Sequence, residues 1–223
     1  MVFKVSKIVR SKRKSFCIEI GEFGEIILRV PNKARNFEIN NFLKKHSNWI
    51  YKKLRIVEKR KENLKPKNFE DGETFLFLGQ SFELKIVENQ KESLIFKDKF
   101  YLSKKYLDKA QEAFIKFYKN RAKEVISERV DYYSKMNSFK FNKIKINSAT
   151  KRWGSCTSKG NLNFSYRLIM APIEIIDYVV IHELVHLVDK THSKSFYEKI
   201  SKILPEYKKS IEWLNKYHYL LKI

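Results

Sequence analysis

The stretch "VVIHELVHLVDKTHSKSF", residues 179–196, holds three of the chain's five histidines within eleven positions. Residues four apart lie on one face of a helix, so the imidazoles of His182 and His186 can reach a common point. Glu183 follows the first histidine, and most neighbouring side chains are apolar. Two histidines and a carboxylate are costly in a buried helix unless they have partners, and a metal ion satisfies all three. The H-E-x-x-H spacing therefore predicts a metal site; the alternative is a pair of ordinary core histidines bonded to backbone carbonyls.

A catalytic zinc site needs three protein ligands and one open position. His192 lies six residues after His186 and is the favoured third ligand. A continuous helix would carry it away from the ion, so we expect the chain to turn near Asp189, with Ser193 or Ser195 capping the helix that follows. The alternatives for the third ligand are Glu198, Glu206, Glu212 and His218.

This ligand set predicts one zinc ion and a hydrolytic reaction. A bound metal lowers the pKa of water to about 7, and Glu183 is close enough to the ligand pair to act as general base. We expect a protein or peptide substrate. The motif does not decide the substrate, so a zinc hydrolase of a non-peptide amide or ester is an alternative. Another is a nucleic-acid-associated protein, either a DNA-linked protease or one with a structural zinc.

The segment "KRWGSC" lies about thirty residues before the ligands. A strand beside an active-site helix can hold an extended peptide at its edge, so Arg152, Trp153, Gly154 and Ser155 are candidate substrate contacts. The alternatives are that Trp153 belongs to the core and that Arg152 pairs with a helix carboxylate such as Asp177. For Cys156 we expect a small buried residue at a strand end, with metal binding or an oxidative switch as the alternatives. The candidates for stabilising an oxyanion are Tyr166, Arg167, Tyr178, Tyr197 and His218.

The order of the predicted elements indicates an α+β fold. Residues 15–31 read as a hairpin, residues 36–62 as a helix and residues 74–102 as further short strands. A long amphipathic helix over 106–136 precedes an antiparallel hairpin or sheet around residues 141–170. The remainder reads as a helix from Pro172, a break near 189–193, a helix to about residue 204 and a final helix from Pro205. We expect residues 1–103 to form a basic, strand-rich N-terminal region with one helix, and residues 104–223 to form a zincin-like domain.

The chain has 223 residues and 47 Lys and Arg against 25 Asp and Glu, a formal net charge of +22. Such a charge attracts polyanions, so nucleic acid is a candidate partner, with a lysine-rich but merely solvated surface as the alternative. Two cysteines form no disulfide framework. We expect no membrane span and a cytoplasmic location, because no long apolar run or signal-peptide stretch is present.

The residues from Arg152 to Ile200 resemble the YgjP-like zinc metallopeptidase family, which is related to the SprT-like and WLM zincins. The shared elements are R-W-G-S-C at 152–156, S-K-G at 158–160, A-P at 171–172, D-Y-V-V before H-E-L-x-H, and H-S-x-x-F from His192. "DGETFLFLG" and "FLKKHSNWI" extend the similarity toward the N-terminus. The resemblance implies a zinc-dependent peptidase with His182, His186 and His192 as ligands and Glu183 as general base. Asp189 stands where metzincins have a glycine, and no clear Met-turn follows, so the chain is not expected to be a metzincin.

Overall fold

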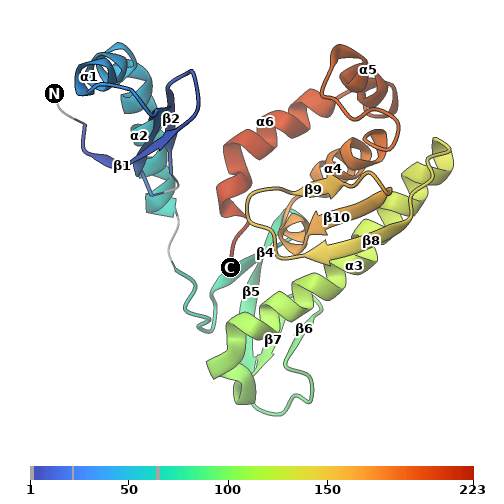
Figure 1. Cartoon of the computed structure of the whole chain (residues 1–223). Helices are drawn as coiled ribbons and strands as arrows, with labels where there is room; N and C mark the ends of the chain where they lie inside the picture. Colours follow the sequence, from blue (N-terminus) through green and yellow to red (C-terminus); the bar gives the residue numbers. More distant parts are fainter. Residues whose placement is uncertain (1–2, 22, 64–65) are drawn as a thin grey trace. The chain divides into compact units, whose positions relative to one another are not determined.

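A computed structural model describes residues 3–21, 23–63 and 66–223, with the backbone alone for residues 61–63. It divides the chain into two compact units, Met1–Lys65 and Pro66–Ile223. Each unit has its own hydrophobic core. Helices and three small sheets confirm the predicted α+β class (Figure 1).

The first unit is a three-stranded sheet followed by two helices. Its elements are β1 (Val5–Ser11), β2 (Cys17–Ile20), β3 (Ile26–Pro31), α1 (Asn36–Lys45) and α2 (Ser47–Asn63). The predicted hairpin is confirmed, since β2 pairs antiparallel with β3. The prediction missed β1, which pairs parallel with β3 on its other side, because parallel pairing of distant segments leaves no turn signature.

The single helix predicted over 36–62 is two helices that meet at His46. The backbone of His46 leaves helical geometry, with φ −102° and ψ 11°. Its ring Nδ1 lies 2.8 Å from the carbonyl oxygen of Phe42. A side chain that bonds the backbone of the preceding turn competes with regular helix geometry, and apolar periodicity does not report this.

The second unit begins with a sheet whose order is β4-β5-β7-β6. Its strands are β4 (Thr74–Phe77), β5 (Gln80–Val87), β6 (Leu94–Phe96) and β7 (Phe100–Ser103). A short 3₁₀ helix, η1 (Lys104–Lys109), leads into the long helix α3 (Ala110–Met136). Phenylalanines join the sheet to this helix: the rings of Phe75 and Phe114 stack with centroids 4.2 Å apart.

The boundary between the units therefore differs from the predicted division at residues 103 and 104. Strands β4 to β7 share a core with α3, whose buried Phe114 and Tyr118 contact Phe75 and Phe100. A division after residue 103 would cut through this aromatic core. The units separate between residues 65 and 66, within the polar sequence "NLKPKNFEDGE" at residues 63–73.

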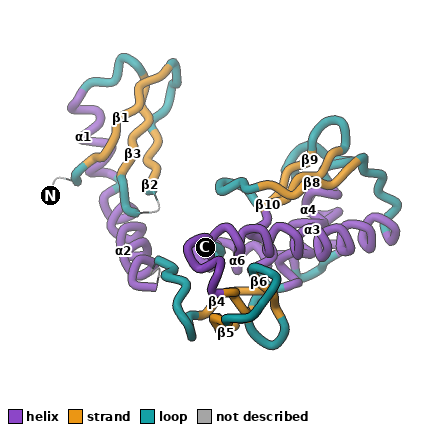
Figure 2. Tube along the Cα trace, turned by 90° about the horizontal axis from the view of Figure 1, so that it is seen from below, coloured by secondary structure: helices purple, strands orange, loops and turns teal. Residues whose placement is uncertain are grey.

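A second sheet, with order β8-β10-β9, lies along the other half of α3. Its strands are β8 (Lys143–Asn147), β9 (Gly154–Cys156) and β10 (Asn161–Ser165). The antiparallel hairpin predicted here consists of β9 and β10, while β8 pairs parallel with β10. Figure 2 shows β4 to β6 and β8 to β10 on different sides of α3.

The C-terminal part is helical, as predicted. A 3₁₀ helix, η2 (Tyr166–Met170), precedes α4 (Ile173–Val185), α5 (Lys194–Ile203), α6 (Tyr207–Tyr217) and η3 (His218–Leu220). The segment "YRLIM" was expected to continue the preceding strand, but it forms η2 and turns the chain toward α4. Among the described residues, no helix is long and apolar enough to span a membrane.

Candidate metal centre and active site

Helix α4 carries the first two candidate ligands. Nearly all of its residues are buried, because apolar side chains cover most of its circumference. The helix ends at Val185, and His186 is its C-cap. His182 and His186 therefore lie at the end of the helix, where the chain begins to turn.

The predicted turn near Asp189 is present, and this carboxylate organises it. Asp189 accepts hydrogen bonds from the Thr191 backbone N–H and hydroxyl at 3.3 and 3.1 Å through Oδ1. Through Oδ2 it accepts from Ser195 Oγ at 2.8 Å and from Lys199 Nζ at 2.9 Å. These bonds, with Lys199 first and Ser195 second, hold the pKa of Asp189 well below its usual range.

Helix α5 then begins at a capped N-terminus. Ser193 accepts a hydrogen bond from the backbone N–H of Phe196 at 3.4 Å, so Ser193 rather than Ser195 is the cap. This geometry returns His192 toward α4.

The three imidazoles meet through their Nε2 atoms. His192 Nε2 lies 3.1 Å from His186 Nε2 and 3.1 Å from His182 Nε2. Nitrogens bound tetrahedrally to zinc at 2.0–2.1 Å are about 3.3 Å apart. Among the described residues, these three histidines are the group whose ligand atoms lie close enough together to hold one metal ion. Three imidazole nitrogens at this spacing fit a divalent ion.

The surroundings of His182 and His186 favour the neutral form that ligates metals. Burial, followed by the charges of His186 and His192, lowers the pKa of His182 to about 4. Burial also lowers the pKa of His186. The Nδ1 of His186 lies 3.0 Å from the backbone oxygen of Asp189, which orients the ring with Nε2 toward the cluster.

Glu183 lies beside this cluster and is 5% exposed. Its Oε2 is buried and has no hydrogen-bond partner among the described residues. Burial raises the pKa of Glu183 to about 7, although the Arg152 charge and the backbone N–H of Cys156 favour ionisation. A carboxyl group with a pKa near neutrality is suited to taking up and releasing a proton.

The family model for the YgjP-like metallopeptidase domain matches residues 14–217. The chain belongs to the YgjP-like family. No curated protein matches the chain. Among solved structures, the metallopeptidase zymogen of Pyrococcus abyssi abylysin is similar at 20% sequence identity, covering 41% of this chain and 93% of that chain with a TM-score of 0.38.

Strand β9 brings the candidate substrate contacts of this YgjP-like domain next to α4. Gly154 faces Glu183: a Cβ added there would lie 2.5 Å from Glu183 Oε1. The backbone of Gly154 therefore lies close to the Glu183 side chain. Trp153 is half-buried and packs on the core, while Arg152 is exposed. Ser155 is half-buried and lies 3.3 Å from Asn163 Nδ2 through its Oγ.

The alternative that pairs Arg152 with Asp177 is wrong. Asp177 binds Arg129 of α3, with Nε–Oδ1 and Nη2–Oδ2 distances of 2.6 and 2.8 Å. Tyr133 donates a third hydrogen bond to Oδ2 at 3.0 Å. This network joins α3 to α4 five residues before His182. Its arginine lies 48 positions from the carboxylate, so the spacing along the chain did not predict it.

Of the other sequence candidates, Tyr178 and Tyr197 have rings near the histidines. The ring centroid of Tyr178 lies 5.9 Å from that of His182, and the ring centroid of Tyr197 lies 6.4 Å from that of His192.

The alternatives for the third ligand lie outside the histidine group. Glu198 faces Lys194, and Glu206 pairs with Lys209. Glu212 is exposed on α6, and His218 contacts Leu214. Tyr166 is buried beside Lys119, and Arg167 is half-buried in η2. Cys156 is half-buried at the end of β9, where burial raises its pKa.

Phe196 was not among the predicted site residues, and its place in the H-S-x-x-F pattern is the one signal for it in the sequence. Its ring lies under all three imidazoles, with centroid distances of 4.9 Å to His182, 4.5 Å to His186 and 5.0 Å to His192. It is fully buried. Phe196 therefore forms an apolar floor that limits how the three rings can tilt.

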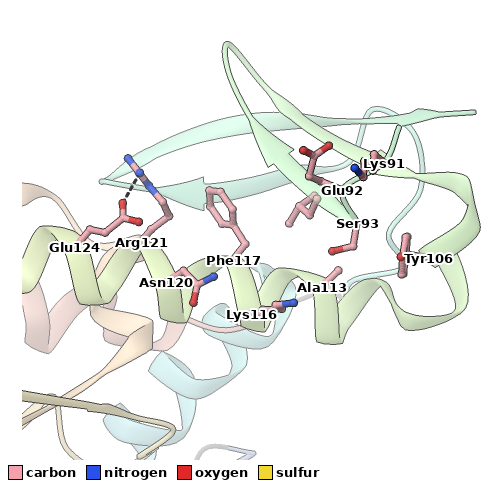
Figure 3. Close-up of a pocket in the computed structure, with 11 residues that line it drawn as sticks. Lys91, Glu92, Ser93, Tyr106, Ala113, Lys116, Phe117, Asn120, Arg121 and Glu124 are labelled. Atoms are coloured by element: carbon pink, nitrogen blue, oxygen red, sulfur yellow. Dashed lines mark hydrogen bonds and ion pairs between the residues drawn. The ribbon is translucent and has the colours of Figure 1, made fainter. Parts of the chain in front are cut away.

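A separate hollow of about 510 Å³ lies beside the first half of α3 (Figure 3). Its lining includes neither the histidines nor Glu183. Acidic and basic side chains alternate there, and Arg121 pairs with Glu124 at 2.5 Å. Because basic and acidic side chains both line this hollow, its charge favours neither an anionic nor a cationic ligand.

Proposed function

We propose that the chain is a zinc-dependent peptidase in which His182, His186 and His192 hold one ion and Glu183 is the general base. The observation that carries the proposal is the meeting of three Nε2 atoms beside a buried carboxyl group whose Oε2 has no hydrogen-bond partner. A structural zinc site needs no such carboxyl group, whereas hydrolysis needs a base beside the reacting water.

A bound zinc ion supplies Lewis-acid polarisation of a carbonyl and lowers the pKa of water to about 7. Glu183 accepts the proton of the attacking water through its carboxylate and later releases it to the departing amine. Burial keeps this carboxyl group close to the pKa at which both transfers are easy. Gly154 leaves the space in which the Glu183 side chain lies.

The substrate is proposed to be a protein or peptide bound in extended form along β9. This strand is at the edge of its sheet in the described chain, and it contacts the helix that carries Glu183. A strand edge offers backbone donors and acceptors to an extended peptide regardless of its sequence. Arg152, Trp153 and Ser155 flank or belong to β9 and are proposed to contact the substrate side chains.

The replacement Glu183→Gln tests this assignment. It removes the base but keeps the shape, so we expect kcat for a casein-derived peptide to fall at least about 100-fold while bound zinc stays at one per chain. Zinc is counted by mass spectrometry of the purified protein. Glu174→Gln is the matched control, because Glu174 lies in the exposed first turn of the same helix. Wild-type cleavage by Glu183→Gln would remove this residue from the reaction.

The ligand assignment is tested by His192→Ala alongside His218→Ala. We expect the first variant to lose most of its zinc and the second to keep it, because His218 bonds the backbone of α6. Retention of tightly bound zinc by His192→Ala would overturn the three-histidine site.

A further inference from the structure

The positive charge of the chain is concentrated in the first unit. Residues 1–65 contain 18 Lys and Arg against 6 Glu and no Asp, a net charge of +12 out of +22 for the whole chain. The candidate metal centre lies in the other unit. Peptide hydrolysis as proposed above does not use this charge, so its role calls for a different ligand.

An aromatic pocket of about 240 Å³ opens on this unit. Its lining comes from β2, α1, α2 and the residues next to them, and consists of Phe16, Cys17, Ile18, Phe42, His46 and Trp49. The rings of Phe16 and Phe42 are 5.2 Å apart, and those of Phe42 and His46 are 4.4 Å apart. Four of the six lining side chains are therefore planar rings arranged around one open space.

Trp49 is an exposed member of this lining, with 42% of its surface accessible. Lys53 Nζ lies 6.0 Å from the centre of the Trp49 ring. Lys45 is exposed four residues before Trp49, at the end of α1. The open ring thus has a positive charge beside it, and no acidic side chain lines the pocket.

We propose that this pocket binds an unpaired base of a single-stranded nucleic acid, with the lysines around it binding the adjacent phosphates. Every base has a flat face that stacks on aromatic rings, and its backbone carries the negative charge that this unit attracts. Bases in a duplex are stacked on one another and cannot enter such a pocket. An apolar peptide would match the rings but would gain nothing from the +12 charge.

The test measures binding of the full chain to fluorescein-labelled oligo-dT, to a duplex of the same length and to heparin, which has charge but no bases. We expect tighter binding to oligo-dT than to the duplex. Trp49→Ala should weaken oligo-dT binding roughly 10-fold and leave heparin binding and the salt dependence unchanged, because stacking is lost and charge is not. Trp49→Phe should restore most of the affinity, because phenylalanine keeps a flat ring on which a base can stack. Unchanged heparin binding by Trp49→Ala separates lost stacking from a structural defect, which would weaken the binding of both polyanions.

Matched controls separate the pocket from the general surface. Phe37→Ala removes an exposed ring on α1 that does not line the pocket, so it should bind oligo-dT as the wild type does. Lys53→Gln should reduce the slope of log affinity against log salt by about 0.7, the loss of one phosphate contact. Glu183→Gln should bind oligo-dT normally, so failure of the peptidase proposal would leave this result unaffected.

Several outcomes would overturn the proposal. One is oligo-dT affinity that Trp49→Ala does not change, and another is an equal loss for oligo-dT and heparin. Preference for the duplex would also overturn it. A Trp49→Ala variant that binds oligo-dT normally but cleaves peptides poorly would assign the pocket to a protein side chain instead.

Discussion

Glu183 shows how one residue depends on an immediate neighbour that is distant in sequence. Its side chain lies against the backbone of Gly154, where even a methyl group would come within 2.5 Å of Oε1. Its Oε2 has no partner in the described chain, and the residue is almost fully buried. The H-E-x-x-H pattern places Glu183 beside the proposed ligands His182 and His186, but the burial and raised pKa of Glu183 come from β9 and the surrounding core.

At the residue scale, the raised pKa of Glu183 predicts a pH-dependent stability of the metal-free protein. The folded pKa is about 7 and the ordinary value is 4.5, so the folded state holds its proton more tightly. This contribution is complete below about pH 4.5 and is lost as pH rises through 7. Glu183→Gln should therefore be more stable than the wild type at pH 8, by as much as about 3 kcal/mol, and equal to it near pH 4.5.

Urea unfolding of both chelator-treated proteins at the two pH values measures this difference. The lowered pKa of His182 destabilises both proteins equally in acid, so it cancels in the comparison. Equal stability at pH 8 would show that the carboxyl group is solvated rather than buried.

A second residue-scale prediction concerns Gly154→Ala. The new methyl group should displace the Glu183 side chain, because its nearest neighbours would be Oε1, Cγ and Cδ of that residue at 2.5–2.8 Å. We expect kcat to fall roughly 100-fold with zinc content unchanged, as a small misplacement of a reacting group has that effect. The double variant Gly154→Ala/Glu183→Asp should be no slower than Glu183→Asp alone, because the shorter side chain relieves the contact. Additive losses would place the effect elsewhere.

At the element scale, the position of α4 depends on the turn between β4 and β5. Backbone N–H groups of Leu78 and Gly79 donate to the carbonyls of Ile169 and Met170 at 2.9 and 3.1 Å. These contacts hold η2 directly before α4, whose first residue follows Pro172. On the other side, Arg129 and Tyr133 bind Asp177, so α4 is held from two directions.

This arrangement predicts that Gly79→Ala destabilises the protein more than Gly72→Ala. Both glycines have positive φ, 81° and 82°, so both substitutions carry the backbone cost of about 1–2 kcal/mol. At Gly79 the added Cβ would also lie 2.9 Å from the Cα of Pro172, whereas nothing lies within 4 Å at Gly72. Overpacking should add about 1–3 kcal/mol at Gly79, measured as the difference in free energy of unfolding in urea. Equal costs at the two sites would show that the turn does not press on Pro172.

At the scale of the whole molecule, the two units have separate hydrophobic cores, so a ligand of one unit is expected to stabilise that unit and leave the other unchanged. The three histidines and Glu183 all lie in Pro66–Ile223, and the aromatic pocket lies in Met1–Lys65. A ligand stabilises the state that binds it, so a metal ion should stabilise the unit that contains its ligands.

Chelation of the full-length protein is therefore expected to accelerate hydrogen exchange in peptides from α4, α5 and the loop between them, and to leave β1 to β3 unchanged. Exchange reports local opening, so the two units can be followed in one experiment. The His192→Ala variant should show the fast pattern without chelator. Faster exchange in both units on chelation would indicate that their folding is coupled.

Much of the site followed from local spacing in the sequence. A helical repeat places His182 and His186 on one face, and the polar residues after Val185 end the helix so that His192 can return. The α+β class and most helices likewise follow from apolar periodicity and turn residues. These properties depend on neighbours within a few positions, and the sequence displays such neighbours directly.

The tertiary structure alone decided which distant segments meet. Gly154 contacts Glu183, and Asp177 forms its ion pair with Arg129 rather than with Arg152. Strand β8 pairs parallel with β10, and strands β4 to β7 belong to the core of the second unit. Parallel pairing and close packing join residues tens of positions apart, and no turn or repeat in the chain marks their partners. Spacing along the chain determined the chemical groups of the site, and the packing of α4 between α3 and β9 determined their burial and hence their acidity.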